Sequence, residues 1–261
     1  MSATTTERRV AVISGGSSGI GAALARQLTA RGVLCVLLAR GRERLERIAS
    51  ETGSETEVCD VADRASVEAA ARRIGARHGA IHLLVNNAGI PGRKGFLELE
   101  PERLERVTAV NYLGSVWCLR AFLALLEAGA PSRVVNVVSV AGAVSGGPSG
   151  PYTASKHAQL AFSRGVAAEL APLGITVHTI NPGLTHTEGF PQDEALARGL
   201  VRRTVMQPER VARAIVGALE HDRREVFVQG YYRVPVALQG VFPGTIARLA
   251  SRLRPAPRQP R

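Results

Sequence analysis

Two residues in the stretch Gly150–His157, GPYTASKH, have types and spacing that suit proton transfer. Lysine and arginine together number 33 in this chain, and only Lys94 and Lys156 are lysine. Tyr152 precedes Lys156 by four residues, so the two side chains share one face if the segment is helical. Lysine is a compact ammonium with rotatable donors and an adjustable pKa, whereas arginine is a rigid fork. Tyr152 and Lys156 are therefore a candidate proton-transfer pair.

A glycine-rich turn near the N-terminus is a candidate phosphate site. The sequence SGGSSGIG, residues 14–21, continues the apolar run VAVIS and precedes a helical pattern, AALARQLTARG. We interpret Gly15 as permitting a tight turn, Gly19 as letting the backbone approach a pyrophosphate, and Gly21 as allowing close helix–strand packing. The helix N-terminus would meet the negative charge. Such turns also join strands to helices without binding anything, but this strand–turn–helix context favours a dinucleotide.

The end of the next apolar run indicates which dinucleotide. An acidic residue about 20 positions after the turn would bind the ribose 2′-hydroxyl of NAD. Arg40 stands there instead, no Asp or Glu occurs at 39–42, and Arg42 is a possible second contact. A guanidinium can hold a 2′-phosphate with paired hydrogen bonds. The sequence favours NADP over NAD, and the alternative is an ordinary surface arginine at a helix start.

The elements that would position these residues alternate between short β-branched runs and longer amphipathic stretches. Strands are expected at residues 10–14, 33–39, 56–59, 81–86, 133–139, 175–180 and 225–228. Their near-continuous apolar character predicts burial on both faces of a sheet. The pattern predicts an α/β, doubly wound Rossmann fold with a seven-stranded parallel sheet flanked by helices. Residues 142–151 and 182–192 are irregular and follow strand ends, where such sheets bind ligands.

Over about residues 8–230 the chain resembles the short-chain dehydrogenase/reductase family in its single-domain form. Ser14–Gly21 is similar to the family's TGxxxGIG turn, with Ser in place of Thr. Asp60–Val61 is similar to its adenine-contacting pair, Asn86–Gly89 to its NNAG strand end, and Pro182–Thr187 to its PGxxxT nicotinamide loop. The resemblance and the arginine argument together imply a cofactor site made of Gly15, Ser17, Ser18, Gly19, Ile20, Gly21, Arg40, Asp60, Val61, Asn87, Ala88, Gly89, Tyr152, Lys156, Pro182, Gly183, Thr185 and Thr187.

The resemblance also implies a catalytic tetrad of Asn111, Ser139, Tyr152 and Lys156. A carbonyl that accepts hydride becomes an alkoxide, so a positioned acid must deliver a proton. Tyr152 would be that acid, with Lys156 favouring its phenolate and donating to the nicotinamide ribose. Ser139 would hold the substrate oxygen, and Asn111 would support a water leading to the lysine. Taken singly, Ser139 could be a strand-end cap and Asn111 a polar residue inside a helix.

Departures from the family pattern occur at two positions. Thr185 stands where Val is usual, and we expect it to be tolerated because the contact there is typically made by the main chain. Gly41 replaces a residue that is often basic beside Arg40, which weakens the argument for NADP without removing it. His157 and His186 lie close to the site in sequence, either as substrate contacts or as solvated loop residues.

Composition excludes several other classes of protein. Cys35, Cys59 and Cys118 have spacings that suit neither a metal site nor a disulfide framework, so we expect a reduced, cytoplasmic protein without a metal. The N-terminus does not resemble a signal peptide, and no run of about 20 apolar residues suggests a membrane span. The net charge is +11, but the arginines are dispersed among acids and no aromatic-interleaved basic patch occurs. We therefore expect no nucleic-acid binding.

The C-terminal part differs from the rest. We divide the chain into a Rossmann-type NADP-binding catalytic domain, residues 1–230, an amphipathic extension of it, 231–254, and a disordered tail, 255–261. After Glu225 there are six arginines and no acid. A helix from Thr245 would carry an apolar stripe of Ile246, Leu249, Ala250 and Leu253. Such a segment could cover the substrate pocket, pack on its own or a neighbouring subunit, or lie on an anionic membrane; packing is the commonest outcome.

We therefore expect an NADP(H)-dependent oxidoreductase that interconverts a small to medium apolar ketone or aldehyde and an alcohol. The substrate pocket should come from residues 91–98, 140–150 and 184–206. One alternative is reduction of 3-oxoacyl thioesters delivered by an acidic carrier protein. Another is a non-catalytic NADP-binding sensor or scaffold, which the complete tetrad disfavours. Apolar positions on more than one face of residues 104–128 and of the helix near Tyr152, together with the resemblance, imply a homodimer or homotetramer.

Overall fold

The computed structural model describes residues 9–92, 98, 100–145, 150–193 and 202–252. Its centre is a seven-stranded sheet in the order β3-β2-β1-β4-β5-β6-β7, and every neighbouring pair is parallel. The strands are β1 (Val10–Ser14), β2 (Leu34–Ala39), β3 (Glu55–Val58), β4 (Leu83–Asn86), β5 (Ser132–Val137), β6 (Ile175–Asn181) and β7 (Glu225–Phe227). The expected α/β fold and all seven expected strands are confirmed. The order reverses between β1 and β4, the switch point where open sheets bind ligands.

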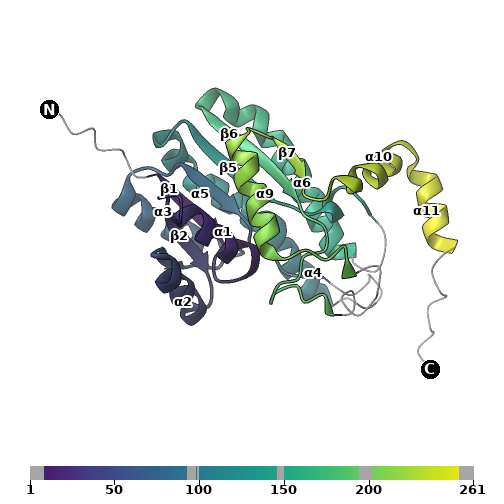
Figure 1. The fold of residues 1–261 in the computed structure, drawn as a ribbon, viewed down its shortest axis with the longest axis horizontal. Coiled ribbons are helices and arrows are strands. Elements are labelled where there is room, and N and C mark those ends of the chain that lie inside the picture. Colours follow the sequence, from purple (N-terminus) through teal and green to yellow (C-terminus); the bar gives the residue numbers. More distant parts are fainter. Residues whose placement is uncertain (1–8, 93–97, 99, 146–149, 194–201, 253–261) are drawn as a thin grey trace.

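Helices cover both faces of this sheet (Figure 1). Ala11 and Ile13 of β1 pack with α1 (Gly19–Thr29), α2 (Arg42–Thr52) and α9 (Pro208–Glu220). Val10 and Val12 point the other way, toward α3 (Arg64–His78) and α5 (Gly114–Ala128). Alternate residues of one strand thus enter two separate cores, because successive side chains of a strand point to opposite faces. This two-sided burial is why the strands are continuously apolar.

The helix before β5 is long and apolar. It comprises α4 (Pro101–Thr108), a π-helical turn (Ala109–Leu113) and α5. Within the described residues this stretch, Pro101–Ala128, is the one helix long and apolar enough to cross a membrane. Of its most apolar 18-residue window, 44% is buried inside the protein. Phe122 and Leu126 of this helix are fully buried. One face of this helix therefore packs in the core against the sheet and α3.

Beyond β7 the chain forms a 3₁₀ turn (Gly230–Tyr232), α10 (Arg233–Val241) and α11 (Pro243–Arg252). These helices extend away from the sheet (Figure 1). Pro235 does not interrupt α10, because it lies in the first turn, where backbone N–H groups have no partner inside the helix. Helix α11 begins at Pro243, two residues before the start expected at Thr245, and proline is common at this first helical position. The tail expected to be disordered, 255–261, lies outside the described residues.

Candidate active site

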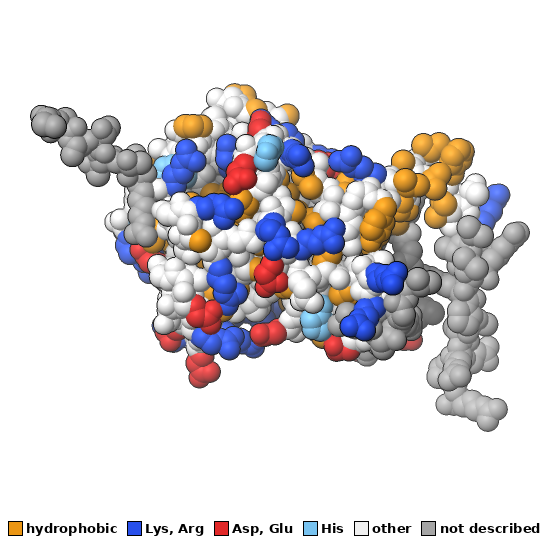
Figure 2. Space-filling model, in the orientation of Figure 1, with side chains coloured by type: hydrophobic (Ala, Val, Ile, Leu, Met, Phe, Trp, Pro, Cys, Tyr) orange, Lys and Arg blue, Asp and Glu red, His pale blue; other side chains and the backbone are white. Residues whose placement is uncertain are grey.

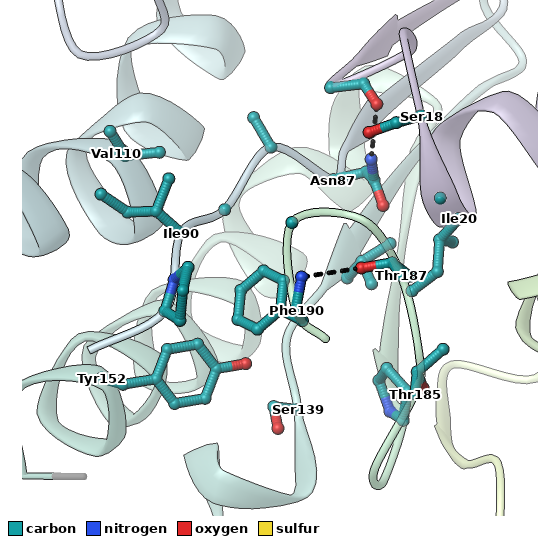
Figure 3. A pocket seen from close by; sticks show the side chains of 18 of the residues that line it. Ser18, Ile20, Asn87, Ile90, Val110, Ser139, Tyr152, Thr185, Thr187 and Phe190 are labelled. Atoms are coloured by element: carbon teal, nitrogen blue, oxygen red, sulfur yellow. Dashed lines mark hydrogen bonds between the residues drawn. The ribbon is translucent and has the colours of Figure 1, made fainter. Parts of the chain in front are cut away.

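A cavity of about 1080 Å³ follows the carboxyl edge of the sheet (Figure 3). Its lining includes segments that follow six strands, β1 to β6. All residues expected to bind the cofactor line it except Gly21. Of the expected tetrad, Ser139, Tyr152 and Lys156 line the cavity and Asn111 does not. Residues far apart in the sequence therefore meet at one edge of the sheet.

The glycine turn forms one end of the cavity. Gly15 has a φ of +66°, which favours glycine, and the turn places the start of α1 at the cavity. A Cβ on Gly21 would lie 2.3 Å from the carbonyl oxygen of Gly15, so glycine is required for the helix to approach the strand end. The Ser14 hydroxyl accepts hydrogen bonds from the N–H groups of Asn87 (3.0 Å) and Ala88 (3.1 Å). The turn after β1 and the segment after β4 are thereby joined.

The part of the cavity that follows β2 carries positive charge. Arg40 lines the cavity as expected, and Arg44 does so too. Arg44 forms an ion pair with Glu188 at 3.2 Å across the cavity. Arg42, named from the sequence as a possible second contact, is instead paired with Glu46 at 3.4 Å and is absent from the described lining. Arg40 precedes α2, whose first turn contains both Arg42 and Arg44. Residues two apart on a helix point to different sides, so Arg44 can face the cavity while Arg42 does not.

Asp60 is held in one orientation at the same end. Partial burial raises the pKa of its carboxyl, but hydrogen bonds from Arg106, at 2.7 Å, and from the N–H of Ala62, at 3.0 Å, hold the pKa below its ordinary value. Asp60 is therefore ionised at neutral pH and accepts hydrogen bonds only. An adenine amino group is a donor that suits it.

Tyr152 projects into the cavity toward Ser139 (Figure 3). Burial raises the pKa of Tyr152, and hydrogen bonding with the Ser139 side chain opposes that shift. The Ser139 hydroxyl also accepts from the N–H of Ala141 at 3.1 Å, so it caps the 3₁₀ turn Val140–Gly142 as well as facing the tyrosine. The Phe190 ring meets the Tyr152 ring edge-on, with centroids 5.7 Å apart. Tyr152 is thus a neutral phenol held in place on two sides.

Lys156 is buried, with 3% of its surface exposed. Its ammonium Nζ donates to the carbonyl of Val137 at 3.0 Å and to Gln159 Oε1 at 2.7 Å. The same Nζ lies 6.0 Å from the centre of the Tyr152 ring. Burial lowers the pKa of Lys156 to about 7. An ammonium has three donors, so one remains for a group in the cavity.

Asn111 lies behind the cavity wall in the π-helical turn. Its Oδ1 accepts from the N–H of Ile90 at 2.8 Å, and its Nδ2 donates to the Ile90 carbonyl at 3.0 Å and to Ser155 Oγ at 3.1 Å. π-Helical turns often occur at functional sites, where they displace one residue from the regular helix. The side chain of Asn111 therefore fixes the segment after β4 against α6 (Gly150–Leu170).

The residues that hold Lys156 were not predicted from the sequence. Gln159 is fully buried, and its Nε2 donates to Ser115 Oγ at 2.8 Å. Ser163, four residues later, accepts from Asn136 Nδ2 at 2.8 Å. Ser155, Gln159 and Ser163 recur every four residues, so they form one polar stripe on α6. A regular polar stripe on a helix that also contains buried apolar residues is the sequence signal that could have found them.

Tyr232, from the C-terminal segment, is another unexpected residue of the cavity lining. Burial and the adjacent Tyr231 raise the pKa of Tyr232 to about 12, and a hydrogen bond with the backbone of Leu184 opposes the shift. A Cβ on Gly183 would lie 2.5 Å from the Tyr232 ring, so the ring packs directly on the segment after β6. The segment beyond residue 230 is therefore part of the site.

The substrate end is mainly apolar. From the regions expected to form it, the described lining includes Pro91, Gly92, Val140, Ala141, Val144, Leu184 and Phe190. Residues 93–97, 146–149 and 194–201 of those regions lie outside the described residues. The described lining contains neither His157 nor His186; their Nδ1 atoms are bonded to the Thr153 carbonyl and the Gln192 N–H.

Comparison with known proteins agrees with this architecture. The family described as short chain dehydrogenase matches residues 9–195. A putative ketoacyl reductase of Streptomyces coelicolor is 35% identical over 191 residues, covering 70% of this chain and 73% of that protein.

Two solved structures extend the likeness. A short-chain dehydrogenase/reductase from Burkholderia phymatum in complex with NAD has a TM-score of 0.80 at 25% identity, covering 95% of this chain and 98% of its own. An actinorhodin polyketide ketoreductase with NADPH has a TM-score of 0.75 at 31% identity, covering 82% and 91%. The matched residues 9–195 contain the glycine turn and all four expected tetrad positions, and on this ground the chain belongs to the short-chain dehydrogenase family.

Proposed function

We propose that this oxidoreductase, which interconverts a ketone and an alcohol, prefers NADP(H) and uses Tyr152 as its general acid and base. The observation that carries the proposal is the convergence of the Ser139 and Tyr152 hydroxyls and the Lys156 ammonium on one cavity with an apolar wall. The test is oxidation of NADPH against a panel of ketones, aldehydes and 3-oxoacyl thioesters. Turnover of any of these supports an enzyme, whereas tight NADPH binding without turnover would favour a sensor or scaffold.

The residues present fit a nicotinamide dinucleotide. The glycine turn places backbone N–H groups and the N-terminus of α1 at the cavity, with no acid in the first helical turn. Arg40 and Asp60 would bind the adenosine end, and Asn87–Gly89 and Pro182–Thr187 the remainder. The bound cofactor supplies the hydride.

The protein's own residues would supply the proton and the charge stabilisation. The substrate oxygen would accept hydrogen bonds from Ser139 and Tyr152. Because burial raises the pKa of Tyr152, the phenol is protonated at neutral pH and can donate as negative charge develops on that oxygen. The phenolate left behind would be stabilised by the Lys156 ammonium. Oxidation of the alcohol would follow the same steps in reverse.

Gln159 would act on the reaction through Lys156, as a positioning residue. Its Oε1 accepts from Nζ at 2.7 Å, and Ser115 fixes the amide at 2.8 Å. An acceptor at this distance favours the charged ammonium, which burial alone disfavours. Asn111 would position Ile90 and the start of α6 in the same indirect way.

NADP preference is supported by charge at the adenosine end. Arg40 and Arg44 both line the cavity, and a guanidinium group suits a 2′-phosphate. Arg44 is now paired with Glu188, so it would exchange a carboxylate for a phosphate. The solved relatives include one complex with NAD and one with NADPH, so the choice for this chain is argued from its own arginines.

The apolar part of the cavity lining limits the class of substrate that we propose. The apolar wall suits a small to medium apolar carbonyl compound, and the ketoacyl reductase relative supports a 3-oxoacyl thioester as the second candidate.

We propose a homodimer or homotetramer formed through α5 and α6. On these helices Trp117, Ala121 and Phe162 are only partly buried, although they pack against the core.

Replacing Tyr152 by Phe tests the general acid. We expect turnover to fall by roughly 100-fold or more, the usual scale for such a group, while NADPH affinity stays nearly unchanged. Steady-state kinetics and fluorescence titration with NADPH measure the two quantities separately. Tyr112→Phe, in the π-helical turn, is the matched control and should keep its rate. A Tyr152→Phe enzyme with a tenth of the original rate would show that Tyr152 is not the acid.

Two substitutions at Gln159 should move the pH profile in opposite directions. Activity requires the charged lysine, so its deprotonation sets the alkaline limb of the rate. In Gln159→Leu a hydrogen bond to the ammonium is lost, and the limb should move about one pH unit lower. In Gln159→Glu a carboxylate would raise the pKa of Lys156 and move the limb higher. If the alkaline limb of the pH–rate profile lies at the wild-type pH in both variants, Gln159 has only a structural role.

The buried lysine should also make stability depend on pH. The folded pKa of Lys156 is about 7, below the ordinary value of 10.5 that applies to the unfolded chain. Between these values the unfolded chain binds more protons, so the free energy of unfolding rises with pH. Compared with Lys156→Met, the wild-type protein should gain roughly 1.4 kcal/mol per pH unit over this interval. Denaturant titrations of the cofactor-free proteins measure the difference; equal pH dependence would mean that Lys156 is charged when folded.

Replacing Arg40 by Asp tests cofactor choice. The change removes a phosphate partner and adds a repelling carboxylate, so kcat/KM for NADPH relative to NADH should fall at least about tenfold. Arg42→Asp is the control, since Arg42 pairs with Glu46, and it should leave the ratio nearly unchanged. An unaltered ratio in Arg40→Asp would mean that this arginine only faces solvent.

A further inference from the structure

Helix α10 and the turn before it expose an apolar face. Nine large hydrophobic side chains are exposed in the described part of the chain, and five of them are Tyr231, Val234, Leu238, Val241 and Phe242. We call these five residues the C-terminal apolar surface. Their exposed fractions run from 46% to 68%. Figure 2 shows apolar side chains gathered over this segment. Scattered exposed apolar residues are ordinary, but a group of this kind marks an interaction site.

The spacing of the three residues inside α10 places them on one side of the helix. Val234, Leu238 and Val241 are separated by four and three residues, the period of a helical stripe, and Tyr231 and Phe242 flank the helix at its two ends. The stripe continues toward α11, where Ile246 follows Phe242 by four residues. All five residues are exposed, so the cores on the two faces of the sheet do not cover this side of α10.

The opposite side of α10 is attached to the cavity walls. Gln239 accepts from the N–H of Ser145 at 2.9 Å and donates to the Ser145 carbonyl at 3.2 Å. Tyr232 lines the cavity and bonds the backbone of Leu184. Ser145 and Leu184 belong to the segments after β5 and β6 that border the substrate end. The helix therefore lies at that end of the cavity, with its apolar face turned outward.

Charge decides what such a face can contact. From Val226 to the C-terminus the sequence holds six arginines and no acid, and the whole chain carries a net charge of +11. Arg233 begins α10 and Arg248 is exposed on α11. A second copy of this chain would meet the surface with the same excess of positive charge. An anionic lipid surface offers both an apolar interior and the opposite charge.

We propose that the C-terminal apolar surface docks on an anionic bilayer, with α10 lying in the headgroup region. The docked helix holds the substrate end of the cavity next to the membrane. If the proposed carbonyl chemistry holds, the substrate is an apolar, lipid-soluble ketone or alcohol that reaches the cavity from the bilayer. The docking proposal depends only on the C-terminal apolar surface and its charge. The substrate class, in contrast, rests on the proposed function.

The experiment compares full-length variants in flotation with phosphatidylcholine vesicles and with vesicles containing phosphatidylglycerol. The test variant carries Val234→Ser, Leu238→Ser and Phe242→Ser. The control carries Leu104→Ser and Leu173→Ser, two exposed apolar residues elsewhere. Wild type and control should bind the anionic vesicles at low salt at least about tenfold more than neutral ones, and high salt should release them. The test variant should lose at least about tenfold in binding.

Three outcomes would overturn docking. Wild-type protein that stays in solution with anionic vesicles at low salt is the first. Equal vesicle binding by the test and control variants is the second. The third is a drop in oligomer mass by light scattering in the test variant when the wild type binds no vesicles, which would assign the surface to a second copy.

Activity measurements separate this idea from the proposed function. Turnover of a water-soluble ketone should be the same in wild type and the test variant. A long-chain ketone dissolved in anionic vesicles should be reduced faster by the wild type. Equal rates on the long-chain ketone would refute the membrane route for substrate. Vesicle binding without any ketone reduction would leave docking supported and refute the proposed function.

Discussion

The burial of the Lys156 ammonium is the constraint on which the site depends. Moving a charge out of water is costly unless hydrogen-bond partners replace the lost water. The two acceptors come from different elements, the Val137 carbonyl of β5 and Gln159 of α6. Satisfying the ammonium therefore fixes the helix against the strand. Tyr152, one turn away on α6, and Ser139, two residues beyond Val137, are brought together by the same contact.

A stripe of polar contacts keeps α6 in that position. Ser155 bonds Asn111, Gln159 bonds Ser115, and Ser163 bonds both Asn136 and Thr179. These contacts join one helix to the long helix before β5 and to the sheet. Buried polar groups that are fully paired specify one arrangement, whereas apolar contacts tolerate sliding. The polar stripe thus positions the proposed catalytic residues more precisely than the surrounding apolar core would.

The two ends of the cavity have different physical character. The adenosine end carries Arg40, Arg44 and the ionised Asp60, and it is bounded by an exposed ion pair between Arg44 and Glu188. The substrate end is apolar and is bordered by segments that α10 connects through Tyr232 and Gln239. Under the proposed function, charge would orient the cofactor and apolar contacts would select the substrate. The C-terminal segment would contribute to substrate selection, although it lies outside the residues 9–195 matched by the family.

The sequence by itself determined the layers and the location of the site. Apolar runs such as VAVIS predict strands buried on both faces, and glycine turns and strand ends predict where a ligand binds, because both signals are local. Arg42 was named from the sequence as a possible second contact beside Arg40, whereas the structure places Arg44 in the cavity lining. Gln159 and Tyr232 were not predicted from the sequence. The places of Arg44, Gln159 and Tyr232 depend on helix register and on contacts between distant segments. Only the tertiary structure decided the places of these residues, because packing, rather than the neighbouring residues in the chain, determines which side chains of different elements meet.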